Sequence, residues 1–132
     1  MTSGDKKKTL LVQQLSLWLP VLIQMGLIFY FSSQPAGSPA LERFPTPPGF
    51  GHLVGYALLA FLLYRALYGS FSGWDLKAAR NTFITGVLYA ISDELHQLFV
   101  PGRHASAADV GIDAAGILMA LLVVRAYNWR RN

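Results

Sequence analysis

The side chains that could do chemistry lie in a few short segments of this sequence. They are carboxyl, imidazole and amide groups. One segment closes an apolar run and contains Asp93, Glu94, His96 and Gln97. Two further acids, Asp109 and Asp113, open the next apolar run, and His52 opens an earlier one. Carboxylates and imidazoles act as general acids and bases, and both are ligands for zinc or iron. These residue types therefore indicate acid–base catalysis or ligand binding.

Helical spacing indicates which of these side chains can act together. Asp93 and Gln97 are four residues apart and share one face of a helix, whereas Glu94 points about 100° away. We expect one of the two adjacent acids to face the other helices and one to face lipid headgroups. Asp109 and Asp113 also share a face.

We expect these faces to meet in one candidate site. Its candidate catalytic residues are His52, Asp93 and Glu94. Its candidate substrate-binding residues are Tyr56, Gln97, Arg103, Asp109 and Asp113. We expect His96 and His104 at the membrane interface or in solvent. No two histidines have the His-x-x-x-His spacing of a helical metal site, so the sequence leaves any metal or cofactor open.

Several of the candidate residues also have structural explanations. The segment from Ser106 to Asp109 matches a capping box, in which serine and acid accept hydrogen bonds from free backbone N–H groups. Asp113 lies one turn deeper, and we expect it to pair with Arg103 or His52. The guanidinium of Arg103 either extends to the membrane interface or binds a phosphate or carboxylate.

The composition indicates which kind of structure must position these residues. Of 132 residues, 53% are hydrophobic and 14% are charged, whereas a soluble domain has about 25% charged residues. A chain this short buries too little of its surface to hide so many apolar side chains from water. There is no cysteine, which excludes disulfides and thiolate metal ligands, and no basic face with interleaved aromatics to bind nucleic acid. The sequence predicts a membrane protein.

Four apolar segments predict an all-α, polytopic membrane domain over residues 1–132. The predicted transmembrane helices are residues 10–31, 50–68, 81–100 and 108–127. Residues 32–49 are rich in proline, glycine and serine, which predicts an irregular connector, and residues 69–80 read as a short polar linker. The first segment is longer than the apolar core of a secretory signal, so we expect it to be retained.

The distribution of charge predicts the orientation. If both termini are cytoplasmic, nine of the eleven Lys and Arg residues lie on the inner side, as expected for an inner-membrane protein. His52, the acids near residue 93 and those after residue 108 then all lie at the outer side. Ionisable groups within a membrane are costly, so such a cluster is a functional-site hypothesis.

The same residues carry a resemblance to a known family. The run from Ser92 to Arg103, SDELHQLFVPGR, is followed by Ser106, Asp109, Asp113 and Gly116. This pattern resembles the C-terminal signature of VanZ-like membrane proteins. The segments WLP at residues 18–20, FYFSSQP at 29–35 and GHLVGY at 51–56 are similar to other parts of that family, so the likeness covers nearly the whole chain.

Two positions differ from the pattern that the resemblance implies. Family members usually carry a lysine three residues before the histidine, where this chain has Gly49, and an asparagine where it has Asp113. The first difference removes a cation and the second adds an anion. The cluster is therefore more acidic here than in the pattern that the resemblance implies.

The resemblance implies a role in the cell envelope or in resistance to amphiphilic, teicoplanin-type glycopeptides. The expected partners are the lipid bilayer and a lipid headgroup, a cell-wall precursor or a lipoglycopeptide. An alternative is a membrane-embedded enzyme that uses His52 and Asp93 as acid and base on a lipid-linked substrate. An ion or proton translocator is a third hypothesis, which the apolar inner halves of the segments disfavour. The sequence does not decide between binding and catalysis, and it leaves the oligomeric state open.

Overall fold

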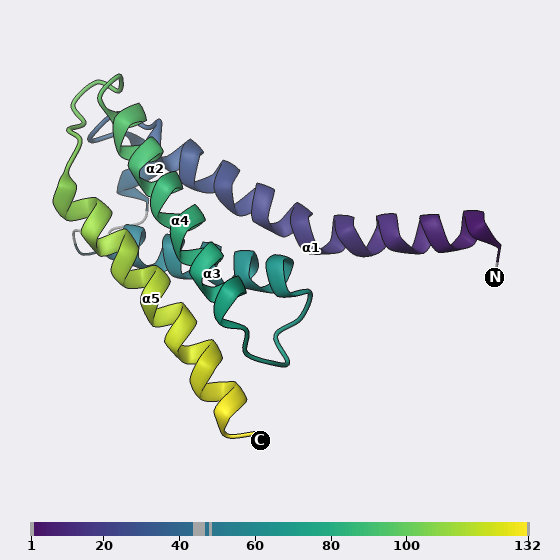
Figure 1. Ribbon diagram of the computed structural model, residues 1–132. Helices are drawn as coiled ribbons and strands as arrows, with labels where there is room; N and C mark the ends of the chain where they lie inside the picture. The colour runs from purple at the N-terminus through teal and green to yellow at the C-terminus, as the bar shows by residue number, and fades with distance from the viewer. Residues whose placement is uncertain (1, 44–46, 48, 132) are drawn as a thin grey trace.

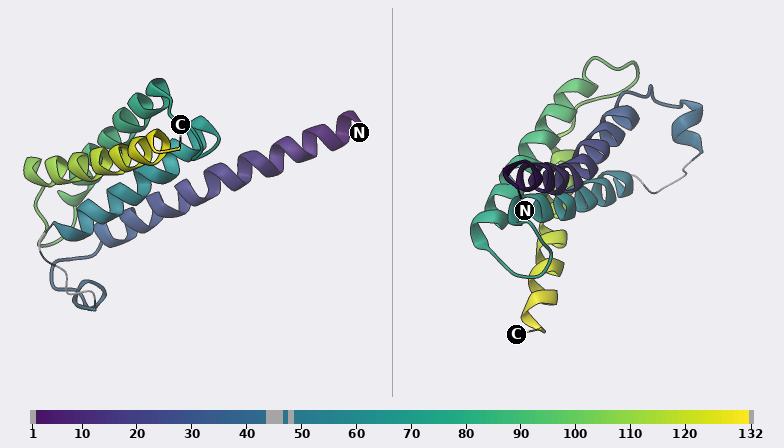
Figure 2. Two further views of the ribbon diagram at one scale, coloured as in Figure 1. Left: turned by 90° about the horizontal axis from the view of Figure 1, so that it is seen from below. Right: turned by 90° about the vertical axis from the view of Figure 1, so that its right-hand side faces the viewer.

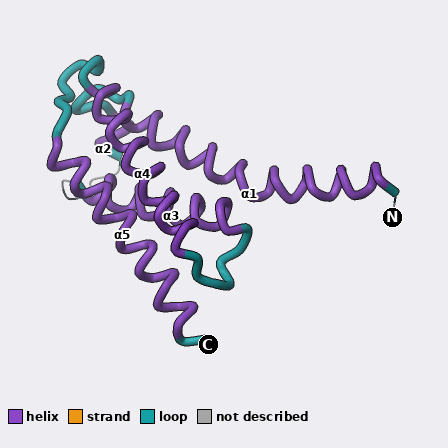
Figure 3. Tube along the Cα trace, viewed as in Figure 1, coloured by secondary structure: helices purple, strands orange, loops and turns teal. Residues whose placement is uncertain are grey.

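The computed structural model describes residues 2–43, 47 and 49–131, and this part of the chain is helical without strands (Figures 1 and 3). The helices are α1 (Ser3–Ser32), α2 (Pro39–Glu42), α3 (Phe50–Tyr68), α4 (Leu76–Gln97) and α5 (Ala107–Trp129). The long helices run up and down. Both termini therefore lie toward the end that carries the loop between α3 and α4, away from the loop between α4 and α5 (Figure 1). The predicted all-α class is confirmed.

Helix α1 is longer than the predicted transmembrane segment. It begins at Ser3 because Thr2 and Asp5 form a capping box, with the Thr2 hydroxyl accepting from the Asp5 N–H. Pro20 lies inside the helix, and the N-terminal part of α1 projects beyond the other helices (Figures 1 and 2). This projecting part exposes large apolar side chains, at Leu10, Leu11, Val12 and Leu15.

The connector after α1 is less irregular than predicted. Its residues 39–42 form the short helix α2, with a proline in the first turn, where the missing N–H costs nothing. Residues 44–46 and 48 of the predicted connector lie outside the described residues. The backbone N–H of Ala36 donates to the carbonyl of Pro101 at 3.3 Å, so the connector lies against the turn that follows α4.

Gly49 precedes α3, at a position where a side chain would be unfavourable. Gly49 has φ of 77°, in the left-handed region. A Cβ at Gly49 would lie 2.8 Å from Cδ1 of Ile112 in α5, which is too close for two carbon atoms. The glycine thus allows the start of α3 to approach α5.

Helix α4 differs most from its prediction over residues 81–100. It begins at Leu76, inside the predicted linker, because the Asp75 side chain accepts from the N–H of Ala78 at 2.6 Å. It ends at Gln97, three residues early. Among the described helices α1, α3 and α5 are long and apolar enough to cross a membrane, and α4, which includes the acids 93 and 94, is not among them. The chain is a membrane protein with these three candidate spans.

Helix α3 lies at the centre of the bundle and packs against α1, α4 and α5, most extensively against α5. Its core side chains include Tyr56, Leu59 and Tyr64, which are less than 2% exposed. Gly116 of α5 allows close packing, since a Cβ there would overlap the carbonyl oxygen of Leu53. Gly86 of α4 does the same against Ile117. Small residues at such crossings bring helix backbones together.

Tyr64 fixes the loop between α3 and α4, and this bond can be tested. Its hydroxyl donates to the carbonyl of Gly73 at 3.0 Å and accepts from the N–H of Asp75 at 2.9 Å. Tyr64→Phe leaves both backbone groups without this partner and is expected to lower the free energy of unfolding by about 1–3 kcal/mol. Thermal unfolding in detergent measures the loss. Tyr68→Phe is the control, because Tyr68 is 40% exposed, and an equal effect of both variants would contradict the assignment.

Candidate functional site

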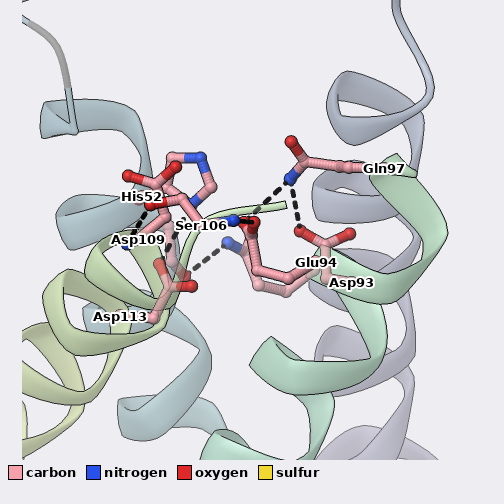
Figure 4. Close-up of polar contacts among 9 residues, drawn as sticks. His52, Asp93, Glu94, Gln97, Ser106, Asp109 and Asp113 are labelled. Atoms are coloured by element: carbon pink, nitrogen blue, oxygen red, sulfur yellow. Dashed lines mark hydrogen bonds and ion pairs between the residues drawn. The ribbon is translucent and has the colours of Figure 1, made fainter. Parts of the chain in front are cut away.

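The polar residues meet where α3 and α5 begin and α4 ends. His52 comes from α3, Asp93 and Glu94 from α4, and Asp109 and Asp113 from α5. Figure 4 shows His52, Asp109 and Asp113 on one side of the cluster, facing the two acids of α4 on the other. The structure thus brings these five of the predicted site residues together. We call them the acid–histidine cluster.

His52 and Asp113 form the pair at the base of the cluster. Nδ1 of His52 lies 3.1 Å from Oδ1 of Asp113, the side chain of Asp113 is fully buried and that of His52 is 23% exposed. Of the two partners expected for Asp113, the structure places His52 beside it and gives it no contact with Arg103. Nε of Arg103 is buried and has no hydrogen-bond partner among the described residues.

Both acids of α4 are buried, each 4% exposed. The expectation that one of them faces lipid headgroups is therefore wrong. Nε2 of Gln97 donates to Glu94 at 3.1 Å and, more weakly, to Asp93 at 3.4 Å. The other carboxylate oxygen of Glu94 accepts from the backbone N–H of Ser106 at 2.7 Å. The loop between α4 and α5 folds over the end of α4, and its N–H group satisfies a carboxylate that would otherwise need water.

The start of α5 is capped differently from the prediction. The Ser106 hydroxyl accepts from the N–H of Asp109 at 3.3 Å, which confirms half of the capping box. In the other half, the Asp109 carboxylate would accept from the Ser106 N–H, but Glu94 takes this bond. The structure gives the Asp109 carboxylate no hydrogen bond in the described part of the chain. Its position beside the other acids therefore has no capping explanation.

Three side chains of the cluster could hold a metal ion. One ligand atom each from His52, Glu94 and Asp109 lie within 4.8 Å of one another. His52 and Asp109 are half-buried and Glu94 is buried, so the group lies near the surface with one side enclosed. Imidazole and carboxylate are a ligand set for zinc and iron.

Tyr56 lies one turn below His52 and is 1% exposed. Its hydroxyl has no hydrogen-bond partner among the described residues, and neither has Oδ2 of Asp113 or Oδ1 of Asp93. The floor of the site thus contains polar atoms with unused hydrogen-bonding capacity.

Sequence reasoning missed two polar contacts that hold α1 against the site. The Gln24 amide, buried in an apolar segment, donates to the carbonyl of Gly55 at 3.0 Å. His96, expected at the interface or in solvent, is half-buried: its Nε2 lies 2.9 Å from the Ser33 hydroxyl and its ring stacks on Phe29. For Gln24, a polar side chain inside an apolar run was the available signal. His104 is exposed, as expected.

The arrangement can bind cations or move protons. Four carboxyl groups and one imidazole lie together, and the nearby Arg103 makes no ion pair with them in the described structure. Four acids beside one imidazole attract positive charge. The His52–Asp113 contact also has the form in which a carboxylate fixes the orientation and the tautomer of an imidazole.

The sequence profile of the VanZ/LLP1 family matches residues 17–128. The matched segment includes the whole acid–histidine cluster and most of the helical bundle. Comparison with curated proteins gives no match, and neither does comparison with solved structures. Three helices of the chain are apolar enough to span a membrane. Because the family profile covers most of the chain, this protein belongs to the VanZ/LLP1 family.

Proposed function

We propose that residues 1–132 form one domain of four transmembrane helices in the inner membrane, with both termini in the cytoplasm. The fourth span is α4, whose 22 residues reach about 33 Å at 1.5 Å per residue. Its full charges lie in the first two turns, at Lys77 and Arg80, and in the last two, at Asp93 and Glu94. The up-and-down course of the chain supports this topology, because the basic residues 6–8, 77, 80, 125, 130 and 131 then share one side.

In this orientation the acid–histidine cluster lies at the outer leaflet and binds the polar headgroup of a lipid or another amphiphile. The observation that carries the proposal is the position of the cluster. Half-exposed His52 and Asp109 stand beside buried Glu94, at one end of helices whose outer faces are apolar. A molecule with a polar head and an apolar chain matches such an arrangement.

Family membership supports a more specific function. The family resemblance implies resistance to teicoplanin-type glycopeptides, which carry a lipid chain, and the polar site fits such amphiphiles or a lipid-linked cell-wall precursor. A strain that lacks the gene is expected to become several-fold more sensitive to a lipid-anchored glycopeptide and not to a glycopeptide without the lipid chain. Complementation with wild-type protein should restore resistance, and complementation with Asp109→Asn should not. Unchanged sensitivity together with an unchanged lipid profile would refute the proposal.

A second candidate is an acid–base enzyme that acts on a lipid-linked substrate. The His52–Asp113 contact favours it, because a carboxylate on Nδ1 orients the imidazole as a general base. Asp93, the expected partner in catalysis, contacts Gln97 instead, so Asp113 takes its place in this mechanism.

The enzyme hypothesis predicts an effect on turnover rather than on binding. His52→Gln is expected to abolish a chemical change in the envelope lipids while the protein still binds the amphiphile. Mass spectrometry of lipids from strains with wild-type and variant protein measures the change, and binding to lipid-loaded detergent micelles is the control. Identical lipid profiles in the wild-type and His52→Gln strains would exclude catalysis by this residue.

A further inference from the structure

We infer that His52, Glu94 and Asp109 bind one divalent metal ion of the zinc type. The three residues come from three different helices, yet one ligand atom of each lies within 4.8 Å of the others. Zinc binds imidazole and carboxylate at about 2.0–2.2 Å in tetrahedral geometry, which places two donors on one ion about 3.4 Å apart. To reach that geometry, the half-exposed side chains of His52 and Asp109 move toward buried Glu94.

The surroundings of His52 point to a metal independently of the three donors. When Asp113 accepts a hydrogen bond from Nδ1 of His52, Nε2 remains unprotonated and available as a ligand. Metal-bound histidines usually donate their other N–H to a carboxylate or a carbonyl in this way. Asp113 is fully buried, so it cannot exchange this contact for one with solvent.

Two further observations separate these residues from ordinary structural acids. The Asp109 carboxylate has no capping role, because Glu94 takes the bond to the Ser106 N–H. The hydroxyl of Tyr56, one turn below His52 and 1% exposed, has no hydrogen-bond partner among the described residues. A buried hydroxyl of this kind is expected to bond to a further polar group, such as water on a metal.

A metal would also change which headgroups the site binds. The acids alone repel anions, whereas a divalent ion with free coordination positions binds a phosphate or carboxylate. This role rests on the proposed headgroup function, but the metal site itself does not. The ligand class is therefore an anionic headgroup that contacts the ion from the open side formed by His52 and Asp109.

Zinc binding to the purified protein tests the site. Full-length protein in detergent, treated with a chelator and dialysed, is titrated with Zn²⁺ by calorimetry, with Mg²⁺ in a parallel titration. We expect one Zn²⁺ per chain and much weaker binding of Mg²⁺. Asp109→Asn and Glu94→Gln should weaken zinc binding at least about tenfold, and Asp113→Asn by about 10–100-fold. His104→Ala, which removes an exposed histidine outside the cluster, should bind as wild type does.

The variants also show whether a loss of zinc binding results from misfolding, and they distinguish the metal site from the proposed headgroup function. Asp109→Asn removes a carboxylate without a structural hydrogen bond, so its thermal unfolding without metal should match that of wild type. Absence of zinc binding by wild type, or equal binding by Asp109→Asn, Glu94→Gln and His104→Ala, overturns the metal site. If Asp109→Asn loses zinc but still restores glycopeptide resistance, the metal site stands and its role in headgroup binding is rejected.

Discussion

Replacing His52 with alanine is expected to lower the free energy of unfolding by about 2–4 kcal/mol. This loss lies between the cost of leaving a buried polar group unpaired and the cost of breaking a buried ion pair. The cost arises at Asp113, whose carboxyl group is fully buried and has its one described hydrogen bond to His52. Without the imidazole, this group has neither a partner nor access to water. Thermal unfolding of the metal-free protein in detergent measures the loss.

A double-mutant cycle attributes the loss to this pair. The double variant His52→Ala/Asp113→Ala removes both partners. Its loss in free energy of unfolding should therefore be smaller than the sum of the two single losses, by about 0.5–3 kcal/mol. His96→Ala is a matched control, because His96 is half-buried but contacts Ser33 and Phe29 rather than an acid. Strictly additive effects of the two substitutions would show that Asp113 does not depend on His52.

The second large effect is expected at the crossing of α3 and α5. In Gly116→Ala the new Cβ would overlap the carbonyl oxygen of Leu53 and lie 3.3 Å from the N–H nitrogen of Ala57. Both neighbours are helix backbone, which cannot move aside as a flexible side chain can. The helices must separate, and we expect a loss of about 3 kcal/mol, at the upper end of typical overpacking costs. Thermal unfolding in detergent checks this.

Gly111 offers a control in the same helix. It is exposed, and a Cβ at Gly111 would meet no atom within 4 Å. Gly111→Ala should therefore be neutral or stabilise α5 by up to about 1 kcal/mol through helix propensity. Because Asp113 precedes Gly116 by one turn and His52 adjoins Leu53, Gly116→Ala should also weaken zinc binding. Wild-type stability of Gly116→Ala would mean that α3 and α5 are not in close contact.

The class of the protein could be predicted from its sequence because it depends on composition and local pattern. Long apolar runs need a nonpolar environment and form helices there to satisfy their backbone. Helices α3 and α5 and the end of α1 were therefore predicted near their observed bounds, whereas α1 begins seven residues earlier, at its Thr2–Asp5 capping box. The bounds of α4 were not, because they depend on the Asp75 cap and on the turn after Gln97 rather than on apolarity.

The sequence by itself determined that the chain is helical and apolar enough for a membrane, and that its acids and His52 occupy the ends of helices on one side. Only the tertiary structure decided which of these groups meet. His52 and Asp113 are 61 residues apart, and their contact depends on the close approach of α3 and α5 at Gly116. Glu94 bonds to the Ser106 N–H because the intervening loop folds back over α4. Helical periodicity acts within one helix, whereas these contacts depend on how separate helices and loops pack.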